Sequence, residues 1–265
     1  MSTSGFISRL TLALSLSSLM AVLAVGRAYA LEEDRDVPRV VSFGGLCANC
    51  ELSGRKLTGA RFMGANFAGA SLVGSDLRGA SFFGSNFSGA DMTRADLRGA
   101  SMMGATFLTA NFTEATLDGL QAKGATFANA NLSRARFEAS DLQGSNFSRV
   151  NGRGVSFASA SLVGVNLAGG DFDHASFRDA TLIGANFSGA QVAGADFRGA
   201  NLTRATFAGV DLTGARGLTQ DQLDDACIDA GTRLPSGLSG HPCRAGRVVI
   251  IRQPPRAPAP PAPPR

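Results

Sequence analysis

The stretch ADLRGASMMGATFLTANF, from Ala95 to Phe112, determines the fold because its large apolar residues recur every five positions. These residues are Leu97, Met102, Phe107 and Phe112. An α-helix would repeat apolar residues every 3.6 positions, and a half-buried strand every 2. A period of five fits neither, so the stretch is predicted to be one section of a repeat structure.

The same five-residue unit runs without insertion through 33 units, whose central residues extend from Leu52 to Leu212. The centre is Leu, Phe, Met or Val in all units except those of Ala122 and Gly152. Ala, Ser, Cys or Gly lies two residues before the centre in 27 units, and Gly lies two residues after it in 22. The residue directly before the centre is mostly Asp, Asn, Ser or Thr.

This pattern, A-[DN]-[LF]-x-G, resembles the pentapeptide repeat family, most directly in ADLRGA at 95–100 and ANFSGA at 185–190. The resemblance covers about Cys47 to Pro235. It implies an all-β fold, a right-handed quadrilateral β-helix of about eight coils with four five-residue sides per coil. A short helix that closes the C-terminal end of the stack is also implied.

Strand alternation supports this fold, because it directs the large and the small residue of each unit inward and the polar residue between them outward. A period of twenty is visible in the sequence itself, since seven of the eight centres spaced by twenty from Phe67 to Phe207 are Phe and the eighth is Leu167. We predict that these rings form a core stack: Phe67, Phe87, Phe107, Phe127, Phe147, Phe187 and Phe207.

The N-terminal segment 1–30 has the layout of a secretory signal peptide. Arg9 precedes an apolar run from Leu10 to Val25, and a small-x-small site ends at Ala30. The sequence therefore predicts a periplasmic or secreted protein with no membrane span after signal cleavage. An uncleaved N-terminal anchor is the alternative.

The remaining chain is divided into four segments: an acidic leader at 31–46, the repeat at 47–216, a C-terminal cap at 217–243 and a Pro/Arg-rich tail at 244–265. In the cap, Thr219 and Gln222 are spaced as a capping box, which predicts a helix over about 220–230 that Gly231 terminates. The tail is expected to be an extended arm that contacts anionic surfaces weakly or serves as a spacer.

Four cysteines in an exported protein suggest disulfides. In the implied fold, Cys47 and Cys50 begin the first coil, where they are either packed thiols or a disulfide. Pairing Cys227 with Cys243 then avoids a bridge between opposite ends of the rod. A redox role for the Cys47-x-x-Cys50 motif is disfavoured because it does not precede a helix in a βαβ unit.

No nucleophile–base pair and no His/carboxylate cluster is apparent, so we expect no catalytic residues, metal site or cofactor. The net charge is +4 for the chain and +2 without Arg9 and Arg27, which gives no general attraction to nucleic acid. Some members of the resembled family mimic DNA and protect topoisomerases. That activity would need an acidic surface and a cytoplasmic location.

The residue after each centre should face solvent, and one such column contains exposed apolar residues. We define the apolar stripe by these members of the column: Met63, Phe83, Met103, Val163 and Ile183. Contiguous exposed apolar surface usually marks a contact. The prediction is a non-enzymatic scaffold that contacts an unknown protein partner or another copy of itself. A passive envelope spacer is the alternative.

Overall fold

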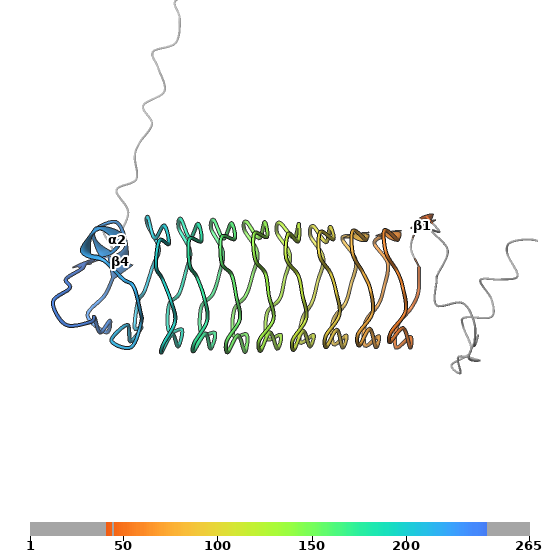
Figure 1. The fold of residues 1–265 in the computed structure, drawn as a ribbon, viewed down its shortest axis with the longest axis horizontal. Helices are drawn as coiled ribbons and strands as arrows, with labels where there is room; N and C mark the ends of the chain where they lie inside the picture. The colour runs from red at the N-terminus through yellow and green to blue at the C-terminus, as the bar shows by residue number, and fades with distance from the viewer. Residues whose placement is uncertain (1–40, 44, 243–265) are drawn as a thin grey trace, which may run out of the picture.

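The computed structural model describes residues 41–43 and 45–242, which form a rod of stacked coils (Figure 1). The predicted signal peptide, the Pro/Arg-rich tail and Cys243 lie outside the described residues. Within them, no helix has the length and apolar character needed to cross a bilayer.

Parallel pairing at a spacing of twenty residues defines the coil. β1 (Val41–Phe43), β2 (Arg61–Met63) and β3 (Ser81–Phe83) form one parallel sheet in that register. Elsewhere each unit contributes a single bridging residue, the polar one before the centre. Since twenty residues contain four units, each coil has four sides, as the twenty-residue recurrence of Phe predicted.

The inward positions form one continuous hydrophobic core along the rod. Ring centroids in the stack from Phe67 to Phe147 are 4.6 to 5.3 Å apart. Leu167 interrupts this stack, which resumes with Phe187 and Phe207 at 4.9 Å. A second stack runs on the opposite side, two units away, from Phe137 to Phe197, with spacings of 5.2 to 5.5 Å.

The two units with unusual centres keep the core filled in different ways. At Ala122 the large and small positions are exchanged, because Leu120 fills the core from the position usually held by a small residue. At Gly152 the missing side chain makes room for the ring of Phe172 in the next coil. A Cβ atom added to Gly152 or Gly170 would lie 2.8 or 2.5 Å from that ring.

The polar residue before each centre often has a side chain that is hydrogen-bonded to its own or a neighbouring coil. Asn or Asp Oδ1 accepts the backbone N–H two residues later, as Asn86 does from Ser88. Asn side chains also bond from coil to coil, for example from Asn86 to Asn66 at 3.2 Å. These bonds explain the preference for Asn and Asp at a position that faces away from the core.

The ladder begins earlier than the predicted boundary at residue 47. β1 pairs in register with β2, and Leu46 bridges to Asn66, so residues 41–43 and Leu46 belong to the ladder and not to a separate leader. Backbone pairing determines this start, and it does not require the consensus side chains. Cys47 and Cys50 are joined by a disulfide at this end.

The C-terminal cap contains a helix that is shorter than predicted, α2 (Gln220–Asp224), which begins with the capping box of Thr219 and Gln222. The predicted end near residue 230 is wrong because the chain returns to the ladder within a few residues. Leu223 and Ala226 are buried on the core, and Cys227 then bridges to Thr206.

Two short strands follow the helix, β4 (Cys227–Ile228) and β5 (His241–Pro242), and they pair in parallel. The cap therefore continues the direction of stacking beyond the last regular coil. Cys227 takes part in a disulfide. Its predicted pairing with Cys243 stays a prediction because Cys243 lies outside the described residues.

Candidate interaction surface

The stripe is exposed where its residues are largest. Met63 and Phe83 each expose 50% of their surface and Met103 exposes 37%. Each side chain directly follows an inward-facing residue; Met63 and Phe83 end β2 and β3, and Met103 begins a turn. Val163 and Ile183, farther along the same column, are half-buried.

Between the two apolar sections the column is polar. Lys123 and Gln143 are exposed, and the ammonium of Lys123 lies 3.0 Å from a carboxylate oxygen of Asp141. The Met63 column, defined as every twentieth residue from Met63 to Thr203, therefore changes from apolar to polar and back to apolar.

The residue two positions after each centre forms a corner of the coil. At the corner beside the Met63 column, most of these residues are glycines and have no side chain. Its residues are Gly64, Gly84, Gly104, Gly124, Gly144, Gly164 and Gly184, each with positive φ. At the other three corners, the left-handed conformation is also adopted by larger residues, such as Arg94, Thr109 and Asp179. Only Gly adopts this conformation without a steric cost, and here it also leaves the backbone bare. We call these seven residues the glycine ridge.

The charged residues of the neighbouring face are largely paired within their own coils. Arg78, Arg98 and Arg198 each bond the Asp two residues earlier in an [AS]-D-[LF]-R-G unit. The guanidinium of Arg78 lowers the pKa of Asp76 from 3.8 to about 2. These local pairs give the face little net field with which to attract a charged partner.

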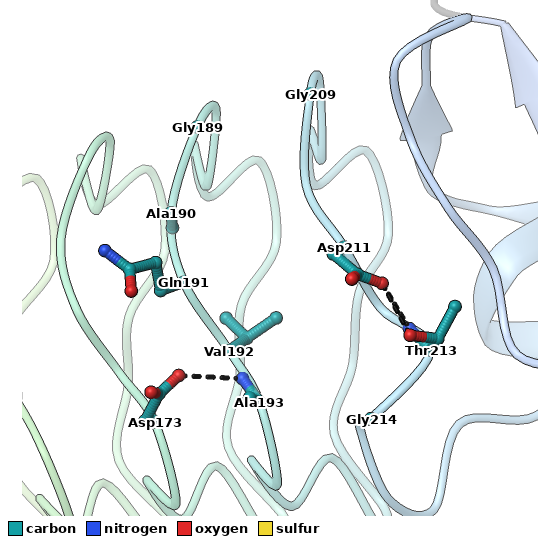
Figure 2. Close-up of a pocket in the computed structure, with 10 residues that line it drawn as sticks. All are labelled: Asp173, Gly189, Ala190, Gln191, Val192, Ala193, Gly209, Asp211, Thr213 and Gly214. Carbon is teal, nitrogen blue, oxygen red and sulfur yellow. Dashed lines mark hydrogen bonds between the residues drawn. The ribbon is translucent and has the colours of Figure 1, made fainter.

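The structure also contains an opening that the sequence did not indicate. Asp171 bridges to Gln191, but no bridge joins Gln191 to Asp211 in the described ladder. Gly214 lacks the positive φ of most corner glycines, and the N–H of Gly194 donates to Gly214 O, one residue beyond the usual register. An open pocket of about 400 Å³ results (Figure 2).

The two carboxylates of this pocket are engaged in local bonds. Asp173 accepts the N–H of Ala193 at 3.0 Å, and Asp211 accepts both the N–H and the hydroxyl of Thr213. Figure 2 shows the remaining lining as small or uncharged residues. In the part of the chain that the structure describes, no three His, Cys, Asp or Glu residues are grouped to hold a metal ion.

Two exposed apolar residues were missed by the sequence analysis. Leu108 exposes 39% of its surface and Leu46 exposes 84%. Leu108 occupies the outward position one unit after Met103, so the same test of outward columns could have found it. Leu46 occupies a bridging position that is polar in most units, and that departure was the available signal.

The comparisons with known proteins agree with the repeat geometry. Models described as pentapeptide repeats and as a pentapeptide repeat region match residues 47–99, 90–167 and 160–216. The chain belongs to the pentapeptide repeat family. Proteins of this family form right-handed β-helical solenoids, so the family fold and the observed stack of coils coincide.

Solved structures of pentapeptide repeat proteins are similar to this chain. HetL from Nostoc sp. strain PCC 7120, involved in heterocyst differentiation regulation, is 29% identical with a TM-score of 0.68, and the match covers 78% of this chain and 91% of HetL. QnrB1, a plasmid-mediated fluoroquinolone resistance protein, is 22% identical with a TM-score of 0.43 over 73% of this chain and 91% of QnrB1. No curated protein matches the chain in sequence.

Proposed function

We propose that this pentapeptide repeat protein is an exported, non-enzymatic scaffold that binds a protein through the apolar stripe. The observation that supports this proposal is the exposure of Met63, Phe83 and Met103 in one column of three consecutive coils. Apolar side chains that line up along a rigid surface lose unfavourable contact with water when a partner covers them.

The rod suits a binding role because its outward residues are held at fixed spacings. Consecutive coils are about 4.8 Å apart, the spacing of hydrogen-bonded strands. The three large residues thus form a line of roughly 10 Å on a backbone fixed by hydrogen bonds on both sides. A preorganised surface loses little conformational entropy on binding.

Export is proposed from segment 1–30 alone and places the contact in the periplasm or outside the cell. Cell fractionation with detection of the mature N-terminus tests it. Cleavage after Ala30 is expected, and a cytoplasmic protein that retains residues 1–30 would contradict export.

Replacing the three most exposed apolar residues tests the binding role. We expect the variant Met63→Ser, Phe83→Ser, Met103→Ser to remain folded and to lose co-purifying proteins or self-association, because its contact surface becomes polar. Val73→Ser is the matched control, since Val73 occupies the equivalent outward position on another side. A folded triple variant that binds like the parent would show that the stripe is not the interface. A parent protein that neither captures a partner nor self-associates would favour the passive spacer.

A further inference from the structure

The order of residues along the Met63 column is nearly symmetrical about its middle. In consecutive coils the column reads Met63, Phe83, Met103, Lys123, Gln143, Val163, Ile183 and Thr203. The midpoint lies between Lys123 and Gln143. On either side of the midpoint, the nearest residue is polar and the next two are apolar.

We infer that the occupant of the stripe is a second copy of this chain, lying antiparallel to the first and related to it by a two-fold axis at the midpoint. This inference rests on the proposed function and names its partner. In the antiparallel arrangement Met103 lies opposite Val163 of the second copy, and Phe83 opposite Ile183 of the second copy. Each of these contacts occurs twice, as a two-fold axis requires.

The polar middle of the column distinguishes the antiparallel arrangement from a parallel one. With parallel rods in the same register, Lys123 would face Lys123 of the second copy, and like charges in contact oppose association. With antiparallel rods, Lys123 faces Gln143 of the second copy. The pairing of Lys123 with Asp141 within each chain can then persist.

The columns that flank this contact contain few charges. Every twentieth residue from Asn66 to Thr206 is Asn or Thr. On the other flank, only Arg61 and Asp141 are charged among the positions from Arg61 to Asn201. In the antiparallel arrangement Arg61 lies opposite Asn201 of the second copy, and Asp141 opposite Gln121 of the second copy. The flanks therefore bring no like charges together.

The glycine ridge lets the two rods approach closely, because no side chain separates the backbones along that corner. A Cβ atom added to any of these seven glycines would meet no atom within 4 Å, so the space above the ridge is open. The single large residue of that corner, Arg204, would lie opposite the bare Gly64 of the second copy. Seven or eight coils at about 4.8 Å and a strip roughly 20 Å wide give about 700 Å² per copy, close to a standard interface.

Light scattering of the full chain across a range of concentrations provides the first test. A dimer is expected. Ile183→Arg should weaken the dimer at least about tenfold, since an unpaired charge buried within a contact is costly. Val73→Arg, on another side of the rod, should leave it unchanged. Ile183 is decisive because a partner that used only Met63, Phe83 and Met103 would not detect its replacement.

Cross-linking through introduced cysteines tests the direction. The two copies of Gln143→Cys lie about one coil apart along the rod and should be joined by a short bismaleimide. Met63→Cys should not cross-link to itself, since its two copies are about 34 Å apart at a coil spacing of about 4.8 Å. It should cross-link when mixed with Thr203→Cys. The parent protein is the control for reaction of the native cysteines.

Three results would overturn the inference. A monomer at all concentrations excludes the second copy. Efficient self-cross-linking of Met63→Cys shows parallel rods, and a dimer with no cross-link at any of the three positions shows another interface. If the protein is monomeric but the triple Ser variant loses a different partner, the proposed function stands and only the identity of the occupant is wrong. If the protein is monomeric and the triple Ser variant loses no partner, both the inference and the proposed function are wrong.

Discussion

The ring of Phe172 occupies space that two glycines leave open, one in the preceding coil and one in its own. A Cβ atom on Gly170 would lie 2.5 Å from Cε2 of Phe172, and backbone and core surround the ring. Gly170 has no positive φ, so replacing it tests packing without backbone strain. Core positions of this kind depend on one another because a protein interior is close-packed.

We expect Gly170→Ala to lower the free energy of unfolding by about 1–3 kcal/mol, the usual cost of overpacking. Adding Phe172→Leu should recover part of this loss, because the smaller side chain frees the space. Denaturant unfolding of the two single variants and the double variant measures the coupling. Strictly additive effects would show that the ring does not fill the space left by Gly170.

Two phenylalanines only one coil apart test which positions face inward. Phe107 is stacked between Phe87 and Phe127, so Phe107→Ala should cost roughly 3–5 kcal/mol through the cavity it opens. Phe83 is half-exposed, and Phe83→Ser should change stability by no more than about 0.5 kcal/mol. Similar losses of stability for both variants would contradict the inward and outward assignment.

The Asp–Arg pairs predict sensitivity to acid. Because folding lowers the pKa of Asp76 from 3.8 to about 2, the ionised group favours the folded state above pH 4. This contribution is lost as the pH falls from about 4 to about 2. Thermal melting of Asp76→Asn should show a smaller fall in Tm over this range than the parent shows. An identical fall in both proteins would exclude a role for Asp76.

At the scale of elements, the C-terminal cap is attached to the last coil through Gln222. Its side-chain Nε2 donates to the carbonyls of Phe197 and Ala200, at 2.9 and 2.7 Å, while its Oε1 accepts the N–H of Thr219. One side chain thus completes the capping box of α2 and satisfies two backbone acceptors at the end of the stack. The cap covers core that would otherwise be open to solvent.

Gln222→Glu separates these two roles. A capping box accepts Glu as readily as Gln, but an ionised Glu cannot donate to the carbonyls of Phe197 and Ala200. We expect a loss of about 1–3 kcal/mol in unfolding free energy at neutral pH, because the carbonyl of Ala200 loses its donor, whereas the carbonyl of Phe197 keeps the N–H of Ala200. If the Gln222→Glu variant were as stable as the parent, Gln222 would act through helix capping alone.

Individual elements show why the sequence predicted the coils better than their ends. Within the repeat, each residue has the same environment every twenty positions, so period and polarity identify the inward side chains. The length of α2 instead depends on where Leu223 and Ala226 meet the last coil. The opening at Asp211 depends on the conformation of Gly214, a residue that matches the consensus and gives no signal.

For the whole molecule, the candidate surface was predicted in part. Met63, Phe83 and Met103 were identified because the repeat assigns them to outward positions, and the structure exposes them. The sequence analysis did not single out the glycine ridge, because Gly is common at every corner. Its unbroken run beside the stripe is nevertheless present in the sequence, as every twentieth residue from Gly64 to Gly184.

The proposed contact surface is tested most directly by oxidation of its methionines with hydrogen peroxide, followed by fragment mass spectrometry. Met63 and Met103 are exposed, whereas Met92 and Met102 are fully buried and serve as internal controls. In dilute protein, we expect Met63 and Met103 to become sulfoxides much faster than Met92 and Met102. When the protein is concentrated enough to associate, or is bound to its partner, oxidation of Met63 and Met103 should slow. Undiminished oxidation of both residues in a complex that has demonstrably formed would contradict the stripe as the contact surface.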